Sequence, residues 1–496
     1  MDKLALQSDI FDLAKGYYIR QVVVIIGIFF LGYVFLSFMQ RRNSNVWKAL
    51  LAYPIGLSIW GLVSYCLLEV GIPYRLSSIG ISILLLLIVL CIYFVKQRVQ
   101  IEFSWKRFCF LFFLVAVISL ISASGILRVS ISNDSVYYYS VFPEILVKTG
   151  YYLASFDVFL TDVGQTTAII NCIPYFFGFN ESFGIQHFLN FNFAGIFYMA
   201  VYETIQNGRD KKKASIFAVF STMLLFSSTP FLLTSKWVLA NVYFMDFLFI
   251  IFYLGIKRER EKGNEEGSQD LLWIQGILIA MLCMMRMEGG MMACLLILCI
   301  SYLSYSNKEL ICYLTLPVCV MQLSYYAMLF IRLKVDPLYS FLDIKKAMVM
   351  VLLLAMVFIY FLLFRNKVFL FLQKYFATFF IGTLSIGNLL LLILNTDRYM
   401  TNLSCFGQNI ILQNGWGYFG FFVLIMLLLL PKSDKKMSYS DLFCIGYILF
   451  TIAVCWARSG TLRIGIGDSG NRVMMQIIPF VVFTIVEKIT ELIYKK

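Results

Sequence analysis

Long runs of apolar residues without charge recur along this chain, and each run is about as long as a bilayer is thick. A helix needs about 20 apolar residues to cross roughly 30 Å of hydrocarbon. The sequence is 60% hydrophobic and 14% charged, and no stretch sustains the alternation of a β-strand. It therefore predicts an all-α integral membrane protein with roughly 13 to 15 transmembrane helices. The predicted helices are 17–39, 47–68, 78–95, 107–127, 186–205, 214–233, 237–256, 271–286, 288–304, 310–330, 347–364, 369–394, 417–430, 439–457 and 473–491.

Basic residues predict the orientation of this bundle, because Lys and Arg are retained in the cytoplasmic loops of membrane proteins. Basic connections alternate along the chain, at 41–48, 96–107, 211–213, 257–270 and 431–436. The loops that then lie outside are 128–185, 395–416 and 458–472. One segment disagrees, since RLKVDPLYSFLDIKK at 332–346 carries four basic residues on the predicted outer side.

Composition also excludes several classes of protein. The formal net charge of +13 follows from these basic loops, and no soluble basic domain is present to bind nucleic acid. The twelve cysteines lie mostly in apolar runs without paired spacing, and His187 is the single histidine, so zinc sites and histidine-based triads are not expected. The sequence contains no GxxxxGK[ST] loop for binding ATP phosphates, so it does not indicate an ATPase.

The predicted outer loop at 128–185 is the most unusual segment. It contains SNDSVYYYS at 132–140, which places Asp134 beside three tyrosines near hydrocarbon, where a charge is costly unless it has a use. From 136 to 147 apolar residues recur at helical spacing, which indicates a helix in the membrane interface that Gly150 ends. Pro174 and the FFGF run predict a second apolar segment that rests on the membrane.

This layout resembles the GT-C superfamily of polytopic glycosyltransferases, which includes the protein O-mannosyltransferases and the aminoarabinose transferases. Those enzymes carry an acidic residue at the start of their first large outer loop, then aromatic residues, an interfacial helix, a glycine and a proline-containing stretch. The matching positions here are Asp134, Tyr137 to Tyr139, the helix up to Lys148, Gly150 and Pro174. The sequence departs from the pattern at Asn133, because the superfamily often has two adjacent acids, and in the three helices that precede the usual first one.

The resemblance implies a division of the chain into N-terminal helices at 1–106, a GT-C-like core at 107–304 and C-terminal helices at 305–496. It also implies transfer of a sugar from a polyprenyl-phosphate donor. In an inverting displacement an acceptor hydroxyl attacks the anomeric carbon, and a carboxylate takes its proton. Asp134 is the candidate base, and its alternative role is that of a loop residue at the start of the interfacial helix.

Guanidinium groups suit the leaving phosphate, and the retention of basic residues inside does not explain the arginines predicted outside. The candidates for binding the donor phosphate are Arg286, Arg398, Arg463 and Arg472. The candidates for orienting substrate are Asn133, Tyr138, Asp157, Asp162 and Glu288. The two aspartates either cap helices and turns or bind acceptor hydroxyls or a divalent cation, and no other cofactor is expected.

Two segments carry the predicted outer arginines. MMRMEGGMM at 284–292 puts Arg286 and Glu288 between apolar runs, two residues apart and so not on one helix face. This spacing predicts a helix break in which Glu288 orients Arg286 toward a cavity, or alternatively a structural ion pair. The Gly-rich segment 459–480 carries Arg463 and Arg472 and suits a phosphate, or is a flexible connection.

The sequence thus predicts a membrane glycosyltransferase that acts on a cell-envelope glycan or a lipid-linked acceptor at the extracellular face of a bacterial plasma membrane. Its expected partners are the lipid bilayer, the lipid-phosphate sugar and the acceptor. One alternative is a polysaccharide polymerase or ligase with a diphosphate-linked donor. The other is a lipid-linked sugar flippase or transporter, although no clear internal repeat of the kind found in carriers is present.

Overall fold

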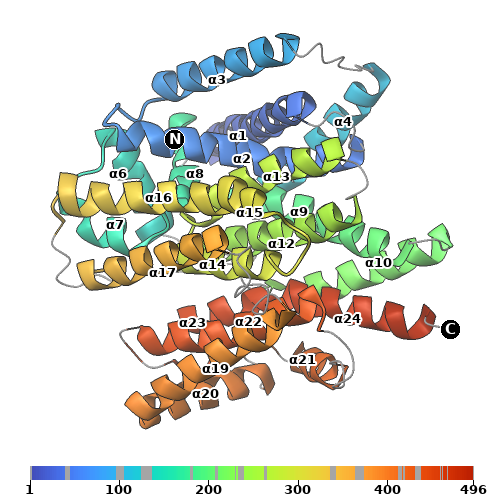
Figure 1. Cartoon of the computed structure of the whole chain (residues 1–496). Coiled ribbons are helices and arrows are strands. Elements are labelled where there is room, and N and C mark those ends of the chain that lie inside the picture. The colour runs from blue at the N-terminus through green and yellow to red at the C-terminus, as the bar shows by residue number, and fades with distance from the viewer. Residues whose placement is uncertain are drawn as a thin grey trace.

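The computed structural model describes residues 3–39, 45–96, 105–124, 137–178, 183–206, 210–228, 231–232, 239–261, 265–335, 342–363, 374–411, 416, 419–429, 437–458, 460, 462–465 and 467–494. Within these ranges all regular elements are helical, and the axes of most of the long helices lie nearly parallel to one another (Figure 1). Ten of the described helical segments are long and apolar enough to cross a membrane, and two more apolar helices are shorter. The chain is an all-α polytopic membrane protein.

The long elements follow the predicted spans closely, because all fifteen predicted spans overlap a helix. They are α1 (Lys3–Met39), α2 (Asn45–Glu69), α3 (Leu76–Lys96), α4 (Trp105–Ala123), α9 (Phe183–Gln206), α10 (Lys211–Phe226), α12 (Ala240–Arg260), α13 (Glu265–Leu282), α14 (Gly289–Ile300), α16 (Leu316–Ala327), α17 (Ile344–Leu363), α19 (Phe376–Leu394), α21 (Phe419–Leu428), α22 (Tyr439–Ala457) and α24 (Ile478–Tyr494). Short elements extend α16 and α24, namely α15 (Asn307–Glu309), η3 (Leu310–Thr315), η4 (Met328–Arg332), α23 (Ser469–Met474) and η5 (Met475–Ile477).

The helix α12 forms the centre of the bundle. Every residue from Ala240 to Arg258 is buried, so the helix is apolar around most of its circumference. Phe249 packs against Phe193 of α9 with ring centroids 5.6 Å apart, and against Phe480 of α24 at 5.4 Å. These aromatic contacts join helices that are distant in the sequence.

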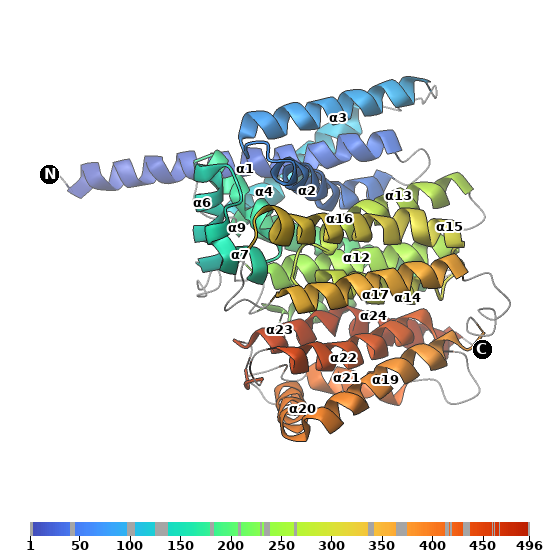
Figure 2. The same ribbon diagram turned by 60° about the vertical axis from the view of Figure 1, so that its left-hand side comes forward.

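Short helices gather at one end of the bundle (Figures 1 and 2). We call residues 137–176 the cap; its elements are η1 (Tyr137–Val141), α6 (Phe142–Thr149), η2 (Ala154–Phe156), α7 (Asp157–Asp162) and α8 (Gln165–Phe176). Gly150 ends α6 as predicted, with a left-handed φ of 79° and an N–H that donates to the Leu146 carbonyl at 2.8 Å.

The Pro174 segment does not rest on the membrane surface as predicted, because the structure places it inside the protein. All residues of α8 from Gln165 to Pro174 are buried, and the helix packs against α2 and α6. The Tyr74 hydroxyl, just after α2, donates to the Ile169 carbonyl of α8 at 3.3 Å. The segment packs on protein because its polar residues find partners there, which a lipid surface does not offer.

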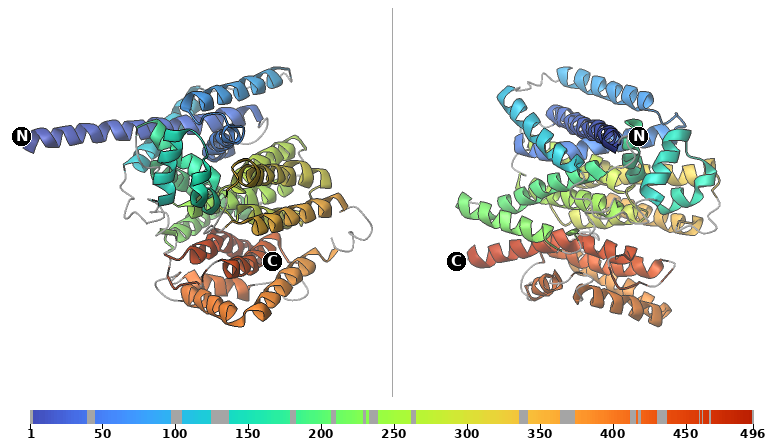
Figure 3. Two further views of the ribbon diagram at one scale, coloured as in Figure 1. Left: turned by 90° about the vertical axis from the view of Figure 1, so that its left-hand side faces the viewer. Right: turned by 180° about the vertical axis from the view of Figure 1, so that it is seen from behind.

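The opposite end of the bundle carries ion pairs between neighbouring helices. Lys257 of α12 bonds Glu203 of α9 at 3.3 Å, and Lys488 of α24 bonds Asp441 of α22 at 2.8 Å. The end of α24 and the start of α10 lie at this end, away from the cap (Figure 3). The start of α10, with the predicted basic residues 211–213, and the end of α12, with Lys257, therefore share the end opposite the cap.

The exceptional basic segment 332–346 joins η4 to α17 at the cap end. Arg332 there donates to the carbonyl groups of Leu68, at 3.1 Å, and of Glu69 at the end of α2. A cation at a helix C-terminus satisfies free carbonyl groups and opposes the helix dipole. A local role thus explains one of the basic residues that run against the charge rule.

Candidate functional site

Between α13 and α14 the chain leaves the helical path over residues 283–288, at the predicted helix break. Carbonyl groups at the end of α13 therefore need partners outside the helix. The Thr167 hydroxyl donates to the Met285 carbonyl at 2.8 Å, and the Gln322 amide donates to the Cys283 carbonyl at 2.7 Å. Irregular backbone among membrane-spanning helices is stable when other protein groups satisfy it in this way.

The cap packs directly on this break. Gly164, just before α8, lies so close to the Met285 carbonyl that a Cβ atom at this position would overlap it. The φ of Gly164 is −67°, which other residues also adopt, so the requirement for glycine is steric. In the first turn of α8 the Thr166 N–H donates to the Met284 carbonyl at 3.1 Å. The cap and the break therefore form one packed unit.

Arg286 and Glu288 form an ion pair within the break. The Arg286 Nε donates to Glu288 Oε1 and its Nη1 donates to Asn241 Oδ1 of α12, both at 2.5 Å. The two side chains are 14% and 8% exposed.

A cavity of about 190 Å³ lies beside this pair, and we call it the arginine cavity. Its wall contains Arg286, Glu288, Arg458, Ser469 and Gly470, with apolar residues of α22 and α23. The Arg286 Nη2 and the Arg458 Nε and Nη2 groups make no hydrogen bond to other residues in the described ranges. Guanidinium N–H groups directed at a shared space are suited to bind an anion with several oxygens.

The segment that follows α22 is held by its own ion pair. Arg458 Nη1 donates to Asp468 Oδ1 at 2.6 Å, and the Asp468 carboxylate is also the N-cap of α23, where it accepts the Gly470 N–H at 2.8 Å. The Asp468 carboxylate thus fixes both the Arg458 guanidinium and the start of α23, which line the arginine cavity.

The predicted outer loop 395–416 contains a helix, α20 (Thr396–Ile411), that braces this segment. Asn402 Oδ1 accepts the Leu462 N–H at 2.9 Å, and Asn409 Oδ1 accepts the Gly465 N–H at 2.6 Å. The two asparagines are seven positions apart in the sequence, which places them on one face of the helix, two turns apart. The helix α20 therefore holds Leu462 and Gly465 in place. These two residues lie in the connection between α22 and α23, which both line the arginine cavity.

The four arginines predicted to bind a phosphate do not all lie at one site. Arg286 lines the arginine cavity, whereas Arg398 donates to the backbone carbonyl of Arg458 and lies 5.5 Å from the Trp456 ring. The side chain of Arg463 is exposed, and Arg472 is buried within α23. Arg458, which the sequence analysis overlooked, completes the wall instead. It directly follows an apolar run, so in the sequence it resembles an ordinary flanking charge.

The other predicted site residues lie in the cap or precede it in the chain. Asn133 and Asp134 lie outside the described residues. Tyr138 is half-buried in η1, Asp157 begins α7 and accepts the N–H of the next residue at 2.8 Å, and Asp162 ends α7. None of these three lines the arginine cavity. The bond made by Asp157 is a local one within the first turn of α7, whose N-cap is Phe156.

Metal binding stays a prediction at this site. Within the described ranges no group of three or more His, Cys, Asp or Glu residues is placed to hold a metal ion. The two aspartates of α7 were the candidates for a divalent cation, and they stand at opposite ends of that helix.

The fold and the site together define a polytopic all-α membrane protein with an arginine-lined cavity at one end of its bundle. No family model, curated protein or solved structure matches this chain.

Proposed function

We propose that this protein is an inverting membrane glycosyltransferase that transfers a sugar from a polyprenyl-phosphate-linked donor to a cell-envelope glycan or a lipid-linked acceptor. The observation that carries the proposal is the arginine cavity. Arg286 and Arg458 share a space of about 190 Å³ at a helix break among membrane-spanning helices. Charged side chains and irregular backbone among membrane-spanning helices are costly and are typical of functional sites.

In the proposed reaction the donor phosphate occupies the arginine cavity. The acceptor hydroxyl oxygen attacks the anomeric carbon, the bond from that carbon to the phosphate oxygen breaks, and the lipid phosphate leaves with the electron pair. Arg286 and Arg458 stabilise the charge that builds on the phosphate, and Glu288 and Asp468 hold the two guanidinium groups in place.

Asp134 is the proposed base, which takes the proton of the acceptor hydroxyl. Its assignment comes from the sequence resemblance. Asp134 comes three residues before Tyr137, where the cap begins, and the cap packs on the helix break that contains Arg286. This closeness in the chain supports a base that acts beside the arginine cavity.

We place the cap end on the extracellular face of a bacterial plasma membrane. The support is the distribution of charge, since the basic residues at the start of α10 and at the end of α12 lie at the end opposite the cap. A lipid-linked donor would then be used where an envelope glycan is built.

Replacement of Asp134 tests the proposal, because Asp134→Asn keeps the size of the side chain while it removes the base. The measurement is transfer of radiolabelled sugar from polyprenyl-phosphate donors to a membrane glycan extract by purified, folded protein. We expect donor-dependent transfer by the wild type and a loss of about 100-fold or more in the variant. Equal rates would remove Asp134 from the chemistry. Transfer from a diphosphate-linked donor alone would favour a polymerase or ligase, and movement of the donor across vesicles without transfer would favour a flippase.

A further inference from the structure

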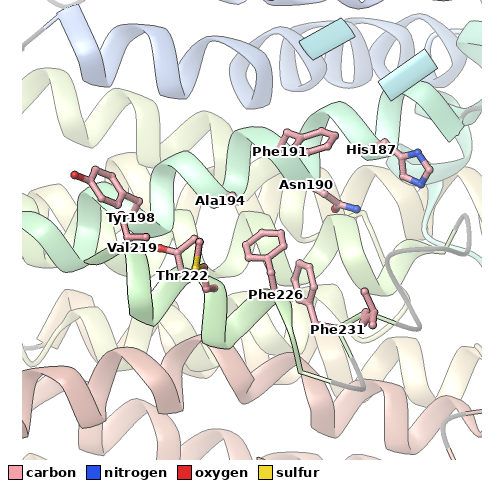
Figure 4. A pocket seen from close by; sticks show the side chains of 11 residues that line it. His187, Asn190, Phe191, Ala194, Tyr198, Val219, Thr222, Phe226 and Phe231 are labelled. Atoms are coloured by element: carbon pink, nitrogen blue, oxygen red, sulfur yellow. The ribbon is translucent and has the colours of Figure 1, made fainter. Parts of the chain in front are cut away.

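A second space in the molecule lies between α9 and α10, and we call it the lateral groove (Figure 4). Its volume is about 480 Å³, within the range of about 300 to 1,000 Å³ typical of ligand pockets. His187 and Asn190 lie at one end of the groove, and Tyr198 and Thr222 lie toward the other. No residue of its wall also lines the arginine cavity.

The length and direction of the lateral groove match one leaflet of a bilayer. From His187 to Tyr198 the groove follows α9 for eleven residues, or about 16 Å. Half of a hydrocarbon core of roughly 30 Å is about 15 Å. The start of α9 is at the cap end, since α9 begins at Phe183, shortly after the cap ends at Phe176 (Figure 2). The groove thus extends from the cap side toward the middle of the bundle.

The lateral groove opens toward lipid. Phe191 of α9, Val219 and Met223 of α10 and Leu232 line it and are all exposed. The outer face of α10 continues this apolar surface through Phe220, which is 64% exposed. A space continuous with the membrane-facing surface and walled by apolar side chains is filled by hydrocarbon and not by water.

The polar groups of the groove are distributed unevenly. The Oδ1 atom of Asn190 is buried and receives no hydrogen bond from the described residues. At the deep end the two hydroxyl groups are already bonded, Tyr198 to Ser215 at 2.9 Å and Thr222 to the Ala218 carbonyl at 2.8 Å. A ligand that fits needs a polar group near Asn190 and an apolar end near Tyr198.

We propose that the lateral groove binds one acyl chain of a phospholipid from the leaflet on the cap side. The chain lies parallel to α9 with its methyl end at Tyr198, and the glycerol region with its water reaches Asn190. The bound chain fills space that α9 and α10 leave between them, so it stabilises their packing. A chain longer than one leaflet would extend past Tyr198 and Thr222, beyond the length of the groove, which favours a phospholipid over the lipid of the proposed donor.

Photo-crosslinking of the full-length purified protein tests this site. The probe is a phosphatidylcholine with a diazirine near the end of one acyl chain, and labelled peptides are identified by mass spectrometry. We expect labelling to concentrate within 190–198 and 219–226. Ala194→Trp fills the groove and should reduce this labelling to background. Met223→Trp fills its exposed mouth and serves as the second blocking variant. Ile216→Trp is the matched control, because Ile216 is exposed on α10 outside the groove.

Two outcomes would overturn the proposal. Undiminished labelling in folded Ala194→Trp and Met223→Trp proteins would show that the chain lies outside the groove. Labelling of the same peptides by a photoactivatable polyprenyl phosphate but not by the phospholipid would assign the groove to an isoprenoid chain. Neither result depends on sugar transfer, so the test is independent of the proposed enzymatic function.

Discussion

Arg458 and Arg463 are five residues apart, yet their side chains have different surroundings. Arg458 lines the arginine cavity and bonds Asp468, whereas the side chain of Arg463 is exposed. Arg458→Gln should lower the rate of sugar transfer by about 100-fold, the effect of removing one preorganised donor to a developing negative charge. Arg463→Gln should change it less than about twofold. Initial rates with a labelled polyprenyl-phosphate donor measure both, and equal losses would contradict the placement of the phosphate.

Glu288 is predicted to contribute to stability as well as to orientation. Glu288→Gln removes the charge that compensates a guanidinium only 14% exposed, so the variant should lose about 3 kcal/mol of the free energy of unfolding. The control is Glu144→Gln, which breaks the Lys148–Glu144 pair of α6. That pair is 72% and 44% exposed and should contribute less than about 1 kcal/mol. Denaturant titrations in one detergent compare the two variants, and similar losses would show that the buried pair is not special.

At the scale of residues, the sequence predicted Arg286 and Glu288 as site residues. It did not predict the residues that hydrogen-bond to Arg286 and to the backbone of the helix break. Arg286 and Glu288 stand out because charge is rare between apolar runs. Asn241 and Gln322 are polar residues with apolar neighbours in the sequence, and only the packing of α12 and α16 against the break gives them a role. Arg458 became apparent only when the end of α22 was placed beside α14.

At the scale of elements, the contact between the cap and the helix break depends on Gly164. Gly164→Ala would place a methyl group into the Met285 carbonyl, so α8 should separate from the break or shift, at a cost of about 1 to 3 kcal/mol. Gly382→Ala on α19 is the control, because nothing lies within 4 Å of its added Cβ. Thermal unfolding and protease cleavage in the cap measure the effect. A Gly164→Ala protein as stable as the control would mean that the cap is not held at this point.

The elements that the sequence predicted well are those defined by hydrophobic length alone. The long spans follow from the thickness of a bilayer, which is known in advance. The helices α8 and α20 were not predicted as packed elements, because their composition is mixed and their partners come from distant parts of the chain. Asn402 and Asn409 bond residues about sixty positions away, and no local pattern indicates such a contact.

At the scale of the whole molecule, charge and position divide the bundle into two ends. The cap, the helix break and the arginine cavity share one end, and the starts of α10 and α22 and the end of α24 share the other (Figures 1 and 3). The segment 332–346 shows that the charge rule holds on average and fails where a basic residue has a local partner. The orientation in the membrane is therefore the property that most needs a direct measurement.

Two single-cysteine additions measure it. Lys148 of α6 and Lys212 of α10 are both exposed lysines, one at each end of the bundle. In intact cells a membrane-impermeant maleimide should label Lys148→Cys and should leave Lys212→Cys unlabelled until the membrane is permeabilised. The wild type gives the background from its own cysteines, most of which lie within the spans. The reverse pattern would place the arginine cavity on the cytoplasmic face, where an envelope glycan is not available, and would exclude the proposed acceptor while it leaves the anion site intact.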